Sequence, residues 1–259
     1  MLYLGFSLSG QEWNVTLHSQ WNNHREFTNQ MVYSLGAEWQ FSHVLTLWAN
    51  VGKHFRAPAV NERLHPIFGN NSLRPERSSG GELGLRWQIN TLTQAEMSIY
   101  QHDIHDLVVL AVNPATGASR ADNVSSVSTL GAEIALSQQW TTRWSSTLNY
   151  SYMDAENTSS HNVVAIRPEH RLNLINEWQI TTPLKLRLEL NSHDGFWFDA
   201  DNTLWSGSVV KLNARLNYTL NNDADIYVRA DNLTNDDTVE LFGFDYRHRS
   251  VYIGGNLRF

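Results

Sequence analysis

Apolar and polar residues alternate along most of this chain, and this period of two constrains the fold more than any other feature of the sequence. In residues 184–190, four leucines alternate with lysine, arginine and glutamate. Successive side chains of an extended strand point to opposite faces, so such a segment has one apolar and one polar face. A helix would need apolar residues at spacings of three and four, and no stretch shows that pattern convincingly. The sequence therefore predicts an all-β, antiparallel fold.

Alternation alone does not separate a membrane barrel from a soluble β-sandwich, because both have one apolar face per strand. The length of the segments favours the barrel: they run for about 10 to 13 residues, whereas strands of about 5 or 6 are usual elsewhere. Aromatic residues also gather at segment ends, where the interfacial girdles of a membrane barrel lie. These residues are Trp13, Trp21, Trp39, Phe41, Trp87, Trp140, Trp144 and Trp178.

The lengths of the connections give the strongest physical signal for the barrel, because short and long connections alternate. Short turns are expected at residues 9–10, 42–43, 90–91, 139–142, 181–183 and 221–223. Longer polar stretches lie between them, at 22–29, 54–76, 113–118, 156–167, 194–206 and 234–247. Short periplasmic turns and long extracellular loops are typical of bacterial outer-membrane barrels, and a sandwich has no reason to sort its loops in this way.

Composition excludes several other classes of protein. The mean hydropathy is −0.40, and no apolar run approaches the about 20 residues that a membrane-spanning helix needs. Charged residues make up 17% of the chain, below the usual share of about 25% in soluble domains. The net charge of −7 argues against a nucleic-acid partner. The absence of cysteine excludes disulfides and thiolate metal sites.

The number and the ends of the segments predict a partial barrel. About thirteen strands are expected, whereas bacterial single-chain barrels use even numbers. An odd set would leave two unpaired edges, whose backbone groups go unsatisfied in lipid. Residues 1–6 have no features of a secretion signal and alternate like a strand already under way, so we expect the front of the protein to be absent.

Several motifs resemble those of TonB-dependent outer-membrane receptors. Residues 52–64 (GKHFRAPAVNERL) and 68–76 (FGNNSLRPE) look like the FRAP…NPxLxPE segment of that family, although Asn71 replaces the usual proline. Residues 228–235 (VRADNLTN) resemble the V-x-N-L-F-D/N of the penultimate strand, with Thr234 in place of the aromatic residue. Further matches, in the order of the family, are 100–108, Asn123 with 130–133, 148–155 and 167–170. The final strand, 251–259, resembles the closing strand of such barrels.

This resemblance implies an antiparallel transmembrane barrel of 22 strands around a plugged lumen. Roughly 13 of those strands would then be present, residues 1–259 would form the C-terminal part of the barrel, and the plug domain and N-terminal strands would be absent. The implied place is the Gram-negative outer membrane. The implied partners are TonB–ExbB–ExbD through the plug, the barrel-assembly machinery, outer-membrane lipid and a colicin or phage. Phe259 would belong to the signal that the assembly machinery reads.

The implied function is energy-coupled uptake of a metal chelate, with a ferric siderophore as the first candidate. Cobalamin and haem are the alternatives for the ligand, and a passive porin-like or structural barrel is the alternative for the function. No resident cofactor is expected. An enzyme is not expected either, because His102-Asp103 and His105-Asp106 have no serine in a nucleophile context near them.

Candidate binding residues lie mainly in the longest predicted connection. His54 and His65 flank the first motif, where a histidine is implied to ligate haem in haem receptors, and Arg56 could bind an anionic chelate or serve the structure. Asn70 is a further ligand-binding candidate. Asp199 and Asp201, with Asp194 and Asn202, could form a calcium loop of oxygen ligands or a solvated acidic loop. Inward-facing charges are expected to form cross-strand pairs or to meet the plug. These are Lys185, Arg187, Glu189, Arg215, Asp225 and Arg229.

Overall fold

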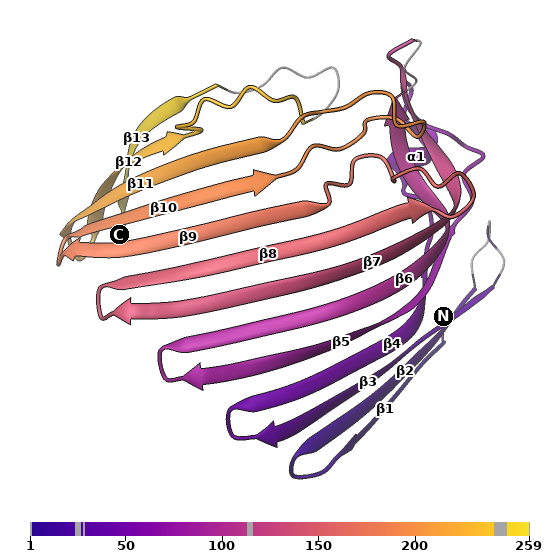
Figure 1. The fold of residues 1–259 in the computed structure, drawn as a ribbon, viewed down its shortest axis with the longest axis horizontal. Coiled ribbons are helices and arrows are strands. Elements are labelled where there is room, and N and C mark those ends of the chain that lie inside the picture. The colour runs from indigo at the N-terminus through magenta and orange to yellow at the C-terminus, as the bar shows by residue number, and fades with distance from the viewer. Residues whose placement is uncertain (1, 24–26, 28, 113–115, 241–247, 259) are drawn as a thin grey trace.

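The structure, a computed structural model, describes residues 2–23, 27, 29–112, 116–240 and 248–258. Within them, thirteen strands form one antiparallel sheet in chain order (Figure 1). The strands are β1 (Leu2–Ser9), β2 (Trp13–Asn22), β3 (Gln30–Ser42), β4 (Leu45–Arg56), β5 (Glu76–Asn90), β6 (Thr93–Val112), β7 (Ser119–Thr141), β8 (Trp144–Asn157), β9 (His170–Thr181), β10 (Leu184–His193), β11 (Val209–Asn221), β12 (Ala224–Asp231) and β13 (Ser250–Leu257). One short helix, α1 (Val60–Leu64), lies between β4 and β5.

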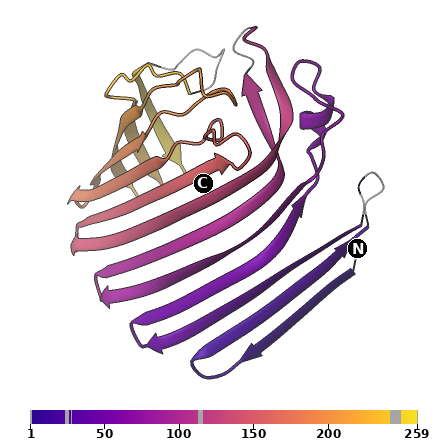
Figure 2. The same cartoon turned by 45° about the vertical axis from the view of Figure 1, so that its right-hand side comes forward.

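The sheet is rolled into a curved, open wall with its short turns along one rim and its long connections along the other (Figures 1 and 2). Short and long intervals between successive strands alternate as predicted, although several expected turns, among them 9–10 and 139–142, overlap the end of the preceding strand, here β1 and β7. The prediction drawn from the alternating loop lengths is therefore confirmed, and the described parts of the long connections gather at the rim that carries α1.

The strand register places the apolar residues of neighbouring strands side by side. Leu186 faces Leu216, and Leu216 in turn faces Val228. No second sheet covers this face, since all thirteen described strands belong to one sheet. The apolar side chains of this face are accordingly exposed, for example Ile253 at 82% and Leu2 at 73%. A soluble sandwich would bury these residues between two sheets, so the structure contradicts that alternative and leaves an apolar surface suited to lipid.

Most of the predicted aromatic girdle forms along the short-turn rim, whereas Trp21 lies at the opposite end of β2. Trp144 stacks between Trp140 and Trp178, with ring centroids 5.2 and 5.6 Å apart. Trp13 faces Trp39 in the register. These rings combine an apolar body with a polar N–H group, the combination that suits a membrane–water interface.

The longest strands depart from the predicted lengths. β6 and β7 have 20 and 23 residues, because their hairpin continues beyond the common rim and packs against the connection after β8. Leu107, Val127 and Val164 are buried at this junction.

The helix α1 was also not predicted. Its five residues are too few to show a helical period, and the carboxylate of Glu62 holds its start by accepting a hydrogen bond of 2.7 Å from the Ala59 amide.

The two edges of the sheet do not meet. Among the described residues, β1 pairs with β2 alone and β13 with β12 alone, as expected for an incomplete barrel. No helix in the described ranges is long and apolar enough to cross a membrane. Phe259, the predicted assembly signal, lies outside the described residues.

The two faces of β7 should respond differently to a new charge. Ile134 lies on the apolar face opposite Met97, whereas Ser137 lies on the polar face opposite Gln94. We expect Ile134→Arg to lower the free energy of unfolding in lipid vesicles by about 2 kcal/mol or more. Ser137→Arg is the control and should cost less than about 1 kcal/mol. Equal losses in urea unfolding would contradict the assignment of the faces.

Candidate functional site

The longest connection of the sheet is tied together by one arginine. Arg56, the last residue of β4, donates from Nε and Nη2 to the two carboxylate oxygens of Glu76, at 2.6 and 2.5 Å. Its Nη1 donates to both oxygens of Glu62 on α1, at 3.1 and 3.0 Å. The planar guanidinium therefore joins the two ends of the connection and its helix, a geometry that lysine does not reproduce.

The two carboxylates that hold Arg56 also hold the backbone. Glu76 accepts a hydrogen bond of 2.8 Å from the Val108 amide on β6, and Glu62 accepts the one from Ala59 at the start of α1. The guanidinium of Arg56 is thus held by carboxylates that also fix the backbone around it. The geometry agrees with a structural role for Arg56, and its role in ligand binding stays a prediction.

The second half of the connection is fastened to the β6–β7 hairpin. The side chain of Asn123 on β7 accepts from the Arg74 amide at 2.8 Å and donates to the carbonyl oxygens of Arg74 and Asp106, at 3.0 and 2.6 Å. Arg74 and Asp106 also form an ion pair of 2.6 Å. Asn70 is 7% exposed and accepts from the Ser72 amide at 3.0 Å. Its position suits the folding of the loop, and its proposed contact with a ligand stays a prediction.

The two candidate haem ligands have different surroundings. The ring of His65, just after α1, stacks on Phe68 with centroids 3.7 Å apart. The His54 ring lies over Gly52 on β4, where an added Cβ would come within 3.0 Å of its Nε2. Across the described ranges, no group of three or more His, Cys, Asp or Glu side chains is arranged to hold a metal ion.

Asp199 serves as an acceptor for its own loop between β10 and β11. It is 1% exposed, and its carboxylate accepts hydrogen bonds from the Leu204 amide at 2.7 Å, the Thr203 amide at 3.0 Å and the Thr203 hydroxyl at 2.9 Å. Burial opposes ionisation of this carboxyl group, but these hydrogen bonds outweigh it and lower its pKa. Asp201, in contrast, is exposed. Calcium binding by this pair stays a prediction.

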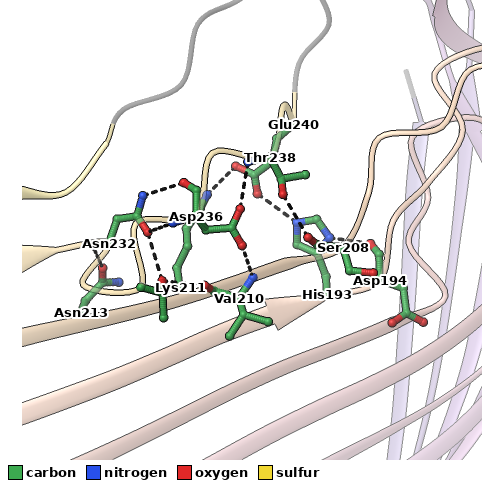
Figure 3. Close-up of polar contacts among 11 residues, drawn as sticks. His193, Asp194, Ser208, Val210, Lys211, Asn213, Asn232, Asp236, Thr238 and Glu240 are labelled. Atoms are coloured by element: carbon green, nitrogen blue, oxygen red, sulfur yellow. Dashed lines mark hydrogen bonds and ion pairs between the residues drawn. The ribbon is translucent and has the colours of Figure 1, made fainter.

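The connection after β12 folds back over the ends of β10 and β11 (Figure 3). Glu240 lies between His193 and Lys211, with one oxygen 2.9 Å from His193 Nε2 and the other 2.7 Å from Lys211 Nζ. His193 Nδ1 lies 2.7 Å from the carbonyl oxygen of Asp194. Both ring nitrogens of His193 thus face acceptors. Burial opposes ionisation of Glu240, but the hydrogen bonds from Lys211 and His193 lower its pKa.

The Asn-Leu-Thr-Asn motif begins this fold-back. Asn232, at a φ of 52°, donates to the Asp236 carbonyl oxygen at 2.8 Å and accepts from the Asp236 amide at 2.9 Å (Figure 3). Asp236 in turn accepts from the Val210 amide on β11 at 2.6 Å. The motif was recognised in the sequence, whereas His193 and Glu240 were not, because neither residue belongs to a pattern of fixed spacing.

Some of the inward charges form the expected cross-strand pairs: Glu177 on β9 lies 3.1 Å from Lys185 and 3.3 Å from Arg187 on β10. Arg187 also lies 3.1 Å from Glu189 of its own strand, and Arg229 pairs with Asp231 of its own strand. Arg215 instead donates to the Asn217 side chain. Nearer the long connections, Arg167 lines a cavity of about 170 Å³ together with His102 and mainly apolar side chains. Burial, with Arg171 nearby, lowers the pKa of Arg167.

The whole arrangement, a barrel wall with a polar inner face and long connections folded over one rim, matches a known family. Residues 2–233 match the family described as TonB dependent receptor-like, beta-barrel. The chain belongs to the TonB-dependent receptor family. Members of this family are transport receptors of the outer membrane.

Similar proteins of known sequence are receptors of this family. The Vitamin B12 transporter BtuB of Photobacterium profundum is 22% identical over 256 residues, which cover 96% of this chain and 41% of that protein. BtuB of Vibrio vulnificus is 30% identical over 108 residues, or 42% of this chain and 18% of that protein. The iron-regulated outer membrane virulence protein of Vibrio cholerae is 22% identical over 204 residues, or 70% of this chain and 31% of that protein.

Solved structures share the fold at low identity. The siderophore receptor PirA of Acinetobacter baumannii has a TM-score of 0.79 at 18% identity, covering 99% of this chain and 45% of that one. The copper transporter OprC has a TM-score of 0.78 at 15% identity, covering 99% and 47%. The chain thus spans less than half the length of the TonB-dependent receptors to which it is similar.

The hydrogen bonds of Arg56 with Glu76 and Glu62 should be needed to order the connection between β4 and β5. Arg56→Lys keeps the charge but cannot contact Glu76 through two nitrogens and Glu62 through a third. We expect faster amide exchange in residues 57–75, equivalent to a local loss of about 1 kcal/mol, since the pair is partly exposed. Arg86→Lys, on the same inner face, should leave that region unchanged. If amide exchange in residues 57–75 is unaltered in Arg56→Lys, the role assigned to the Arg56 hydrogen bonds is contradicted.

The Glu240 contacts should make the connection after β12 sensitive to acid. The pKa of Glu240 lies below its ordinary value of 4.5, so its contribution is fully present above that pH and is lost as the pH falls through the lowered pKa. At pH 7 we expect Glu240→Gln to speed amide exchange in residues 232–240 by a few fold, or about 1 kcal/mol. Glu169→Gln is the control. If amide exchange in Glu240→Gln matches that of the wild type, the ordering role assigned to the contacts of Glu240 with His193 and Lys211 is contradicted.

Proposed function

We propose that this chain is part of a TonB-driven receptor that takes up a metal chelate, with a ferric siderophore as its cargo. The observation that carries this proposal is the family match across residues 2–233, together with the likeness in fold to proteins named as siderophore receptors. A receptor of this kind needs no covalent chemistry from the chain. It binds the chelate among the long connections and passes it inward through the lumen.

The long-connection rim supports binding of an anionic chelate. Arg167 places a cation beside an otherwise mainly apolar cavity, and the Nη1 group of Arg167 donates to the Ile166 carbonyl oxygen at 3.1 Å. Further along the inner face, a cavity of about 560 Å³ is lined by Trp48, Arg171 and three glutamates, Glu82, Glu96 and Glu133, among others. The Trp48 ring suits a ligand with flat rings, whereas the cation that favours negative charge at the rim is Arg167.

Cobalamin is the second candidate cargo, because two of the similar proteins named above are vitamin B12 transporters. Cobalamin does not call for a cation at the rim, so Arg167 separates the two candidates. Under the siderophore proposal, Arg167→Gln weakens binding of the cargo. Under the cobalamin proposal, this substitution leaves binding unchanged.

We also propose that residues 1–259 form the C-terminal part of a larger barrel. The other strands and the plug would belong to the rest of the receptor polypeptide. The two edge strands of the described sheet, β1 and β13, support this view, since each pairs with one neighbour only. The backbone N–H and C=O groups of an open edge would have no hydrogen-bond partners in lipid. The partners that follow are TonB–ExbB–ExbD through the plug, the barrel-assembly machinery and outer-membrane lipid. A colicin or phage could use the same exposed connections. The proposed location is the Gram-negative outer membrane.

The test uses the receptor as its gene encodes it, in the native membrane. Uptake of labelled ferric catecholate, ferric hydroxamate and cyanocobalamin is compared in cells with and without the gene, and in cells that lack TonB. We expect uptake of one ferric chelate that needs both the gene and TonB. Uptake of cyanocobalamin alone would favour the second candidate. Uptake that continues without TonB would contradict the proposed mechanism.

A further inference from the structure

Three arginines stand directly opposite one another on the inner face of β10, β11 and β12. Arg187 faces Arg215, and Arg215 faces Arg229. Directly opposed positions on antiparallel strands have Cβ atoms about 5 Å apart, and like charges at such positions destabilise a sheet. A row of three cations therefore requires compensating negative charge.

The outer two arginines have that compensation within the sheet. Arg187 pairs with Glu177 and Glu189, and Arg229 pairs with Asp231. The repulsion that remains in the row falls on its central member, Arg215.

Arg215 is held in place without an ion pair. Its Nε donates to the Asn217 side chain at 2.9 Å, and its guanidinium carbon lies 3.9 Å from the centroid of the Tyr227 ring. Among the described residues, no carboxylate lies within ion-pair distance of Arg215, and its two terminal nitrogens make no hydrogen bond. The Tyr227 ring and Asn217 thus fix one face and one edge of the guanidinium and leave its terminal nitrogens for another partner.

A cavity of about 440 Å³ opens at this point of the inner wall. The charged residues that line it are Arg187, Lys211, Arg215, Arg229, Glu189 and Asp231. Two of these cations also have carboxylate partners outside the lining, Glu177 for Arg187 and Glu240 for Lys211. Among the described residues, Arg215 is therefore the one cation of the lining that has no carboxylate partner.

We propose that Arg215 is the centre of a carboxylate-binding site on the lumen wall. The terminal nitrogens of a fixed guanidinium match the two oxygens of a carboxylate in a bidentate contact. The carboxylate would neutralise the middle of the arginine row. It can come from a free polycarboxylate or from an acidic side chain of the receptor. This proposal does not depend on which cargo the receptor transports.

The first experiment measures binding of citrate, as the free carboxylate probe, to the purified receptor as its gene encodes it. Calorimetry in detergent at low salt compares the wild type, Arg215→Gln and the control Arg143→Gln, which removes an arginine from an exposed turn. If the carboxylate is free, citrate binds the wild type and the control equally, and Arg215→Gln weakens binding by about tenfold or more.

The second experiment detects a carboxylate supplied by the receptor itself. The thermal unfolding midpoints of the wild type and Arg215→Gln are compared at 20 mM and 1 M NaCl. If an acidic side chain occupies the site, Arg215→Gln is destabilised more at low salt, because salt screens the lost attraction. If no carboxylate is present, removal of Arg215 relieves repulsion within the row, and the destabilisation is smaller at low salt or reversed. Loss of the Tyr227 and Asn217 contacts contributes equally at both salt concentrations.

Either citrate binding that depends on Arg215 or a larger loss of stability at low salt supports the site and identifies the source of the carboxylate. The proposal is overturned if citrate binding is absent or unaffected by Arg215→Gln and the loss of stability is not larger at low salt. If Arg215→Gln fails to fold, Arg215→Lys carries both comparisons with a smaller expected effect, since it keeps the charge but loses the bidentate contact.

Discussion

Backbone hydrogen bonding between neighbouring strands is the constraint on which the rest of this structure depends. A chain that faces lipid has no water to satisfy its N–H and C=O groups, so each strand must pair along its whole length with both neighbours. Pairing fixes the register, and a slip of one residue would turn every leucine of a strand toward the lumen. The register observed from β1 to β13 keeps most apolar residues on one face, although Trp48 lies on the inner face.

The long connections cannot use that ladder, and they satisfy their polar groups with side chains instead. Arg56 with Glu76, Asn123 with the Arg74 backbone, and Asp199 with its own turn all serve this purpose. The family motifs in these connections therefore have a structural reason: the residues that make them recognisable are largely those that hold the backbone. Ligand specificity in such a receptor would then depend on the residues between these anchors.

Much of the fold could be predicted from the sequence, because a period of two and the alternation of loop lengths report directly on pairing and on the two rims. The contacts between distant residues could not be predicted. Nothing in the spacing of His193, Lys211 and Glu240 indicates that they meet, since the fold-back after β12 brings them together. The row of Arg187, Arg215 and Arg229 likewise depends on the register of three strands, which no single segment contains. The inward direction of these charges was predicted, but not their alignment.

The central claim is that one face of each strand meets lipid and the other meets the lumen, and a cysteine scan of β7 tests it most directly. The chain has no cysteine of its own, so single cysteines at residues 130–137 can be labelled without background. The account predicts that a fluorophore at even-numbered positions is quenched by spin-labelled lipid. A water-soluble thiol reagent should react faster at odd-numbered positions. Equal behaviour along the strand, or the opposite alternation, would contradict the account.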